Sequence, residues 1–272
     1  MEQTDALYLD IILDPIRTCA NYKPKFGRGS KGGGLTLEQF QELYQKDPFY
    51  KWFGLDHPLM YAAHKVAGGM TSVYRQIGVG CEKLFKAILC NSLGLSDENV
   101  TWSYEITLST GKKRTLYLDA RVTLEQIPDK VKREKFRKWM EGIAKNVGID
   151  YGVFTKLKGT VFEVRQGYKS KDSKRQNADI ANAAIAYTNA YLPCAVILST
   201  QIDVDVLDRY RREKWAILIG TVNSNNPLIS TYDFMRDIVG YDLAKFFARN
   251  SEILSKVVVD VLKALLNQEG ER

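Results

Sequence analysis

Hydrophobic positions recur at helical spacing in the stretch that follows Thr71 and Ser72. The apolar residues of this stretch lie near helical spacing and so gather on one face: Val73, Ile77, Leu84, Ile88 and Leu89. Thr71 and Ser72 are suitable N-caps, and Gly94 is a typical residue just past a helix end. The pattern therefore predicts an amphipathic helix that ends at Gly94.

The next two segments alternate apolar and polar residues, which indicates strands rather than helices. TWSYEITLS (101–109) and RTLYLDARVTL (114–124) are separated by the turn-like TGKK (110–113). A period of two places the apolar residues of each segment on one side. We expect an antiparallel hairpin with one buried face.

Residues 128–147, which begin at Pro128 and precede Gly148, have the composition of an exposed basic helix. GIDYGVFTK (148–156) and TVFEVRQGY (160–168) follow, separated by Leu157 to Gly159. Both segments are apolar enough for central strands, so the sequence predicts a second hairpin that turns across LKG.

Helical and strand patterns then alternate towards the C-terminus. We expect a helix from about Ser173 to Tyr191 that ends before Pro193, a buried strand in CAVILST (194–200), a helix in DVDVLDRYRREKW (203–215), a buried strand in AILIGTV (216–222), and amphipathic helices over 230–266. This order favours an α/β fold, with a mixed β-sheet flanked by helices.

The first seventy residues look helical and rich in loops, and YKPKFGRGSKGGG (22–34) interrupts them. The glycines of this segment allow mobility, and its lysines and arginine keep it positively charged. It is either a solvated surface loop or an arm that binds a phosphate backbone. We expect residues 1–70 to form a helical appendage and residues 71–272 one compact unit.

Overall charge favours a polyanionic partner. Lys and Arg together number 39 against 32 Asp and Glu, which gives a net charge of +7 and an isoelectric point near 9.0. Such a surplus is common among soluble proteins, so it carries weight only together with a localised basic cluster.

Cysteine and histidine usage makes zinc-binding and disulfide-rich classes improbable. The four cysteines are far apart and form no CxxC pair, and there are only two histidines. The N-terminus, MEQTDALYLDIILDP, is acidic where a signal peptide would be basic. No apolar run approaches the roughly twenty residues that span a bilayer, so we expect a cytoplasmic protein without a membrane partner.

Candidate chemistry lies in the second predicted hairpin. Glu163 and Arg165 are two residues apart and so share one face of their strand. If the chain turns at Leu157 to Gly159, Asp150 lies nearly opposite them, with cross-strand partners about 5 Å apart. Two neighbouring carboxylates need a cation between them, and the hard cation that prefers carboxylate and carbonyl oxygens is Mg²⁺. The predicted metal ligands are Asp150, Glu163 and the carbonyl oxygen of Val164.

These residues carry a resemblance to a known family. I-D-Y-G-V-F on one strand and F-E-V-R-Q-G-Y-K-S-K-D on the next resemble the bipartite motif of the PD-(D/E)xK nucleases, and are most similar to type II restriction endonucleases. The similarity covers roughly residues 72–220. It implies a restriction-endonuclease-like fold, Mg²⁺ as cofactor, double-stranded DNA as substrate, and a homodimer that matches a palindromic site.

The sequence departs from the family motif at two positions. Ile149 stands where the family has Pro, and Arg165 where Lys is usual. An arginine cannot act as a general base, but it can orient the attacking water and stabilise charge on phosphorus. Lys169, which lies two alternations further along the same face as Arg165, is a substitute if the strand extends that far.

A second aspartate competes with Asp150. Asp119, in LYLDARV, lies on the second strand of the first hairpin, where the family commonly has its Asp strand. If residues 124–158 are an insertion, Asp119 is the metal ligand instead. Glu82 resembles the accessory acid that some family members contribute from the preceding helix, although it is also compatible with a solvent-facing position.

A basic run follows Glu163. The residues expected to bind DNA, by phosphate contacts or by base contacts in a groove, are Lys169, Lys171, Ser173, Lys174, Arg175, Gln176 and Asn177. The alternative is a capped helix start with exposed lysines, and the strand charges of Glu163 and Arg165 can similarly belong to a solvated face. Unpaired charges at Glu163 and Arg165 would be costly if their strand is central in the sheet.

The sequence therefore predicts a Mg²⁺-dependent, sequence-specific DNA endonuclease of the type II restriction class. Its expected catalytic residues are Glu163, Asp150 or Asp119, Arg165 and Lys169. Two alternatives stay open: a structure-specific repair nuclease of the same fold, and a non-catalytic DNA-binding protein in which Arg165 marks a lost catalytic lysine.

Overall fold

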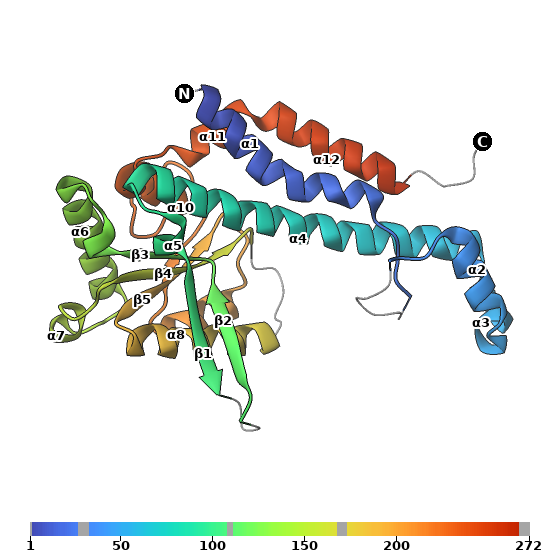
Figure 1. Cartoon of the computed structure of the whole chain (residues 1–272), viewed down its shortest axis with the longest axis horizontal. Coiled ribbons are helices and arrows are strands. Elements are labelled where there is room, and N and C mark those ends of the chain that lie inside the picture. The colour runs from blue at the N-terminus through green and yellow to red at the C-terminus, as the bar shows by residue number, and fades with distance from the viewer. Residues whose placement is uncertain (1, 27–32, 108–110, 168–172, 267–272) are drawn as a thin grey trace. The chain divides into compact units, whose positions relative to one another are not determined.

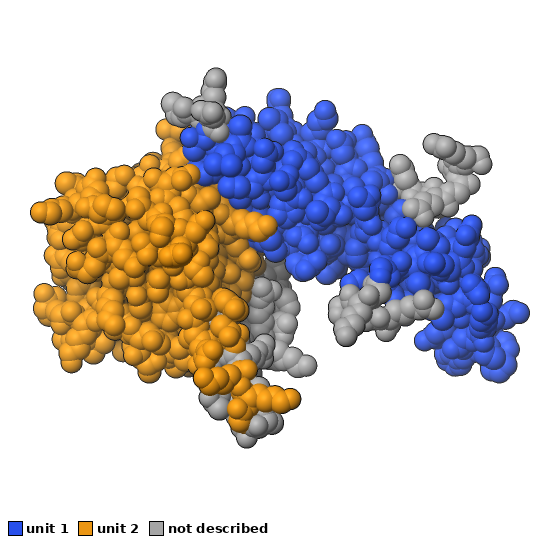
Figure 2. Space-filling model, viewed as in Figure 1, with its two compact units in different colours: residues 1–80, 249–272 blue, residues 81–248 orange. Residues whose placement is uncertain are grey.

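The computed structural model describes residues 2–26, 33–107, 111–167 and 173–266. The chain is a mixed α/β protein that divides into two compact units (Figures 1 and 2). Unit 1 comprises residues 1–80 and 249–272, and unit 2 comprises residues 81–248. This division differs from the predicted one, because the C-terminal helix groups with the N-terminal helices and the boundary lies within a helix.

Unit 1 is helical in its described part. Its elements are α1 (Glu2–Arg17), η1 (Thr18–Asn21), α2 (Leu37–Gln45), α3 (Pro48–Trp52), the first part of α4 (Pro58–Leu93), and α12 (Ser251–Leu266). Helices α1 and α12 run side by side along α4 (Figure 1). Glycines allow this close packing, because a Cβ at Gly69 would lie 2.6 Å from Leu265, and one at Gly80 2.7 Å from the carbonyl oxygen of Ile12.

Helix α4 begins earlier than the sequence predicts, at Pro58, and ends as predicted before Gly94, whose φ is +69°. Thr71 and Ser72 lie inside the helix. Thr71 donates a hydrogen bond to the carbonyl of Ala67, four residues back, rather than capping a helix start. The prediction of a helix start at Thr71 and Ser72 is therefore wrong, because these residues lie in the interior of a longer helix.

Unit 2 contains all the described strands. Its elements are the remainder of α4, α5 (Asp97–Val100), β1 (Trp102–Thr107), β2 (Lys113–Leu118), β3 (Ala120–Thr123), η2 (Leu124–Gln126), α6 (Lys130–Asn146), α7 (Tyr151–Phe154), β4 (Gly159–Arg165), α8 (Ser173–Thr188), β5 (Tyr191–Ile197), α9 (Val204–Arg212), β6 (Ala216–Leu218), α10 (Thr231–Asp233), the π-helical η3 (Phe234–Val239) and α11 (Leu243–Arg249).

The main sheet has the order β3-β4-β5-β6, in which β3 is antiparallel to β4 and the other pairs are parallel. The predicted first hairpin is present as β1 and β2, which pair antiparallel. After Leu118 the chain changes partner: Ala120 to Thr123 pair with β4, not with β1. The sheet is therefore mixed, as predicted, and helices cover it (Figure 1).

Strand β4 is buried on both faces. Phe162 contacts the rings of Phe85 and Trp139 on one face. Val161 belongs to a cluster on the other face that includes Ala186 of α8 and Trp215. Side chains alternate along a strand, so Glu163 shares the face of Val161. A carboxylate in this position is surrounded by core on most sides, which places the candidate chemistry within the fold rather than on a solvated edge.

The segment after β6 is fixed by a buried aspartate. Asp233 accepts hydrogen bonds from Ser224 Oγ at 2.5 Å and from the Asn226 N–H at 3.1 Å, and pairs with Arg236 at 3.0 Å. Burial alone would raise the pKa of Asp233. The hydrogen bonds from Ser224 and Asn226 and the charge of Arg236 outweigh it, so the pKa lies below its ordinary value.

Because the pKa of Asp233 is lowered, its contribution to stability is present at neutral pH and disappears as the pH falls through the folded-state pKa. We expect Asp233→Asn to reduce the free energy of unfolding by about 1–3 kcal/mol at neutral pH. The difference from wild type should shrink towards about pH 3. Urea unfolding of wild type and variant at neutral pH and at about pH 3 measures this difference, with substitution of the exposed Asp208 by Asn as the control. A difference that is independent of pH would contradict the assignment.

Within the described ranges, no helix combines the length and the apolar character that crossing a bilayer requires.

Candidate active site

Glu163 lies near the carboxyl end of β4, and only 6% of the residue is exposed. Its position follows from the register of the sheet, because Glu163 pairs with Ala195 of β5 and shares the face of Val161. A buried carboxylate is costly unless charges or hydrogen bonds compensate it. Its neighbours therefore decide what this side chain does.

Asp119 lies beside Glu163, at the junction between β2 and β3. Its N–H donates to the carbonyl of Phe162 at 3.0 Å, which extends the pairing of β3 with β4 by one residue. Its Oδ2 accepts a hydrogen bond from the N–H of Val164 at 2.7 Å. Asp119 is thus held against the two residues of β4 that flank Glu163, by main-chain groups of that strand.

Arg165 completes the cluster. Its Nη2 forms an ion pair with Glu163 Oε1, and its Nη1 lies 4.0 Å from Asp119 Oδ2. The side chains of Glu163, Arg165 and Asp119 are 8%, 11% and 19% exposed. The guanidinium offsets the repulsion between two carboxylates that are close together and poorly solvated. The predicted proximity of two acids and Arg165 is therefore found, with Asp119 as the second acid.

Asp150 lies elsewhere, and the predicted hairpin across LKG is wrong. Residues 151–154 form the helical turn α7, and Asp150 is its N-cap, with its carboxylate accepting the N–H of Gly152 at 2.7 Å. The antiparallel partner of β4 is β3, so no strand carries Asp150 towards Glu163. Asp150 is exposed and comes before the start of β4, whereas Glu163 is near the carboxyl end of that strand.

The apolar pattern of this segment has a local explanation. Gly148, with φ of +70°, ends α6, and Asp150 then caps a single turn. Tyr151 and Val153 alternate with small or polar residues as in a strand, yet both are exposed. The capping aspartate and its Gly two residues later were the signals that favoured a turn over a strand.

The donor set at Asp119 and Glu163 suits a hard cation. In the part of the chain that the structure describes, no group of three or more His, Cys, Asp or Glu side chains converges on one point. Mg²⁺ is usually held by one or two carboxylates, with waters and substrate phosphates completing its shell. The carbonyl of Val164, which accepts a long 3.4 Å hydrogen bond from Arg165, adjoins both acids.

The predicted DNA-binding residues are placed only in part. Lys169 and Lys171 lie outside the described residues, while Ser173, Lys174, Arg175, Gln176 and Asn177 occupy the first turns of α8. Helix α8 is the next described element after β4 and leads into β5, which is parallel to β4. Glu82 is on the portion of α4 that belongs to unit 2 and is partly buried.

A polar loop that the sequence reasoning missed also borders this end of the sheet. The N–H of Ser199 donates to the carbonyl of Gln166 at 2.8 Å, and a Cβ at Gly167 would lie 3.3 Å from Ser199. The signal was the run Ser199 to Gln201, which follows a fully buried strand. Residues after parallel strands gather at the carboxyl edge, where ligands commonly bind.

Comparison of the chain with protein-family models, with curated protein sequences and with solved structures finds no match.

Proposed function

We propose that the protein is a Mg²⁺-dependent DNA endonuclease of the PD-(D/E)xK type, related in function to type II restriction enzymes. The observation that carries the proposal is the cluster of Asp119, Glu163 and Arg165 on adjacent strands. The order of elements around it supports a restriction-endonuclease-like fold: a long helix precedes the strands, β3 is antiparallel to β4, and α8 then leads into β5, which is parallel to β4. Asp119, rather than Asp150, takes the role of the first motif's aspartate.

In this proposal Asp119 and Glu163 hold Mg²⁺, and the carbonyl of Val164 is a further oxygen donor. When bound, Mg²⁺ lowers the pKa of water and neutralises charge on the scissile phosphate. Arg165 stays protonated, so its part is to donate hydrogen bonds to the phosphate oxygens and to orient the attacking water. The proton of the attacking water is proposed to leave to solvent, because an arginine cannot accept it.

Double-stranded DNA is the proposed substrate, and the net charge of +7 together with the basic sequence that follows β4 supports it. A homodimer is proposed on the ground that a twofold assembly suits a palindromic site. The basic and polar residues at the start of α8, among them Lys174 and Arg175, are proposed to contact the strand that is cut, because α8 is the next described element after the strand that bears Glu163 and Arg165.

The test is incubation of the purified protein with phage DNA in Mg²⁺ and in EDTA. We expect discrete fragments in Mg²⁺, none in EDTA, and a loss of more than about a hundredfold in Glu163→Gln, because replacing even groups beyond the metal ligands typically costs 10–100-fold. Glu105→Gln, on an exposed position of β1, is the matched control and should cut normally. Cleavage restricted to ends, flaps or mismatches would indicate a repair nuclease instead.

One observation favours a second candidate, a non-catalytic DNA-binding protein. The guanidinium of Arg165 already pairs with Glu163 and approaches Asp119, so the two acids do not depend on a metal for compensation. Intact DNA binding without cleavage in Mg²⁺ or Mn²⁺, and unchanged in EDTA, would establish this candidate and overturn the nuclease.

A further inference from the structure

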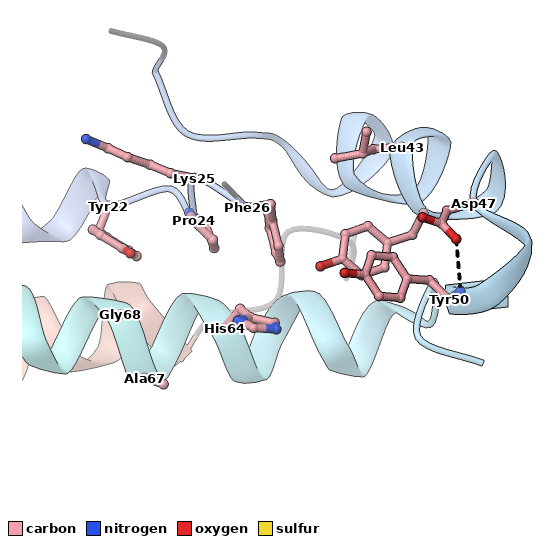
Figure 3. A pocket seen from close by; sticks show the side chains of 11 residues that line it. Tyr22, Pro24, Lys25, Phe26, Leu43, Asp47, Tyr50, His64, Ala67 and Gly68 are labelled. Atoms are coloured by element: carbon pink, nitrogen blue, oxygen red, sulfur yellow. Dashed lines mark hydrogen bonds between the residues drawn. The ribbon is translucent and has the colours of Figure 1, made fainter. Parts of the chain in front are cut away.

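A pocket of about 610 Å³ lies within unit 1, far in sequence from the candidate active site. It is bounded by residues 22–26, by α2 and the start of α3, and by the side of α4 that carries His64 and Gly68 (Figure 3). Gly68 is needed for its shape, because a Cβ there would lie 2.1 Å from the hydroxyl of Tyr22. The pocket is large enough for a nucleotide-sized ligand.

Aromatic rings form one wall of this pocket. Tyr44 and Tyr50 stack with ring centroids 4.7 Å apart and planes 20° from parallel, and Phe26 meets the ring of Tyr44 edge-on at 5.6 Å. Tyr50 remains 38% exposed. Phe26 has φ of +43°, an uncommon conformation for a large side chain, which costs of order 1–3 kcal/mol and tends to occur at binding sites.

The polar groups of the pocket discriminate between ligand classes. Oδ1 of Asp47 accepts the N–H groups of Phe49 and Tyr50, so this oxygen caps the start of α3. Lys25 lies at the opposite end of the pocket from Tyr50 (Figure 3) and is exposed. An ammonium ligand would be repelled by Lys25, whereas a phosphate would be attracted to it. An aromatic ring attached to a phosphate fits both ends.

The surface next to the pocket also carries exposed aromatic and basic side chains. Helix α3 and the residue after it expose three further aromatic side chains: Phe49 at 57%, Trp52 at 80% and Phe53 at 67%. Lys51 lies among them and is also exposed. Aromatic side chains interleaved with lysines are typical of surfaces on which successive bases stack while the cations contact the backbone.

Burial, together with the neighbouring Tyr50 and Asp47, raises the pKa of Tyr44 above its ordinary value, so its hydroxyl remains a hydrogen-bond donor.

From the aromatic wall of the pocket and the position of Lys25, we infer that the pocket binds an unpaired nucleobase of a single-stranded segment of nucleic acid. The base stacks on the Tyr44–Tyr50 wall, and Lys25 contacts a phosphate. This inference does not depend on cleavage by Asp119 and Glu163.

The test is fluorescence anisotropy of a labelled oligothymidylate of about eight nucleotides, a length in the usual site-size range, with the full chain in EDTA. Tyr50→Leu should weaken binding about tenfold, which corresponds to one stacked base. Tyr50→Trp should retain or improve binding. The matched control, Tyr117→Leu, changes an exposed tyrosine of unit 2 and should have no effect.

A duplex of the same length should be less affected by Tyr50→Leu, since its bases are not free to stack. Equal binding of the oligothymidylate by wild type and by a folded Tyr50→Leu variant would overturn the inference. So would tetramethylammonium displacing the oligonucleotide completely at low concentration, because the pocket would then be a cation site. Since every arm is measured in EDTA, failure here is distinct from failure of the proposed nuclease.

Discussion

Asp119→Asn is expected to lower Mg²⁺-dependent DNA cleavage by more than about a hundredfold, whereas Asp150→Asn should leave the rate unchanged. The substitution at 119 keeps a side-chain oxygen that can accept the Val164 N–H, so the junction between β2 and β3 should persist. It removes the negative charge that the proposed cation requires beside Glu163. Asp150 only caps α7, and an asparagine caps nearly as well.

The pair is informative because both aspartates fit the family motif in the sequence and only one lies beside Glu163. Cleavage rates of the two variants under single-turnover conditions, with thermal unfolding as a check on folding, decide between them. Full activity in Asp119→Asn with loss in Asp150→Asn would contradict the proposed site. If both aspartate variants were active while Glu163→Gln was not, Asp119 would be excluded as a metal ligand, and Glu163 would be the one proposed carboxylate ligand that cleavage requires.

Elements fixed by short-range signals could be predicted from the sequence. The β1–β2 hairpin and helix α6 follow from periodicity and from caps or turns a few residues away, and β5 and β6 follow from short apolar runs on either side of α9. Glu163 and Arg165 could also be paired in advance, because a spacing of two in a strand places both side chains on one face.

Partners distant in the sequence could not be predicted with the same certainty. Strand β3 pairs with β4 across an insertion that contains α6 and α7, and nothing local to Ala120 specifies that pairing. The predicted hairpin over residues 148–168 instead paired β4 with the apolar segment nearest to it in the sequence. It failed because the local cap that Asp150 forms with Gly152 favours a helical turn, and because the exposure of Tyr151 is a tertiary outcome. The grouping of α12 with the N-terminal helices likewise depends on close contacts such as that between Gly69 of α4 and Leu265.

Replacement of Arg165 should have the largest effect on stability. In the folded chain its guanidinium lies between two poorly exposed carboxylates, and removing one member of a buried charged cluster typically costs about 3–5 kcal/mol. We expect Arg165→Met to lose about this amount at neutral pH. Methionine fills much of the same volume, so the loss reports the charge more than a cavity.

The loss should depend on pH. Without Arg165, Asp119 and Glu163 repel each other in the folded state, which then binds protons more readily than the unfolded chain. Stability therefore falls as the pH rises, and the variant should be closer to wild type at about pH 5 than at about pH 8. Arg121→Met is the matched control, because Arg121 bonds to the carbonyl of Asn99 rather than to an acid. Its loss should not vary over this range.

Magnesium provides the decisive comparison. If Asp119 and Glu163 form a cation site, Mg²⁺ should raise the melting temperature of Arg165→Met more than that of wild type, because the ion replaces the missing positive charge in the folded state only. Arg121→Met should respond as wild type does. A stability loss in Arg165→Met that neither acid nor Mg²⁺ relieves would mean that the two carboxylates do not act as a coupled pair. The arginine would then be a packing residue, and the proposed metal site would lose its physical basis.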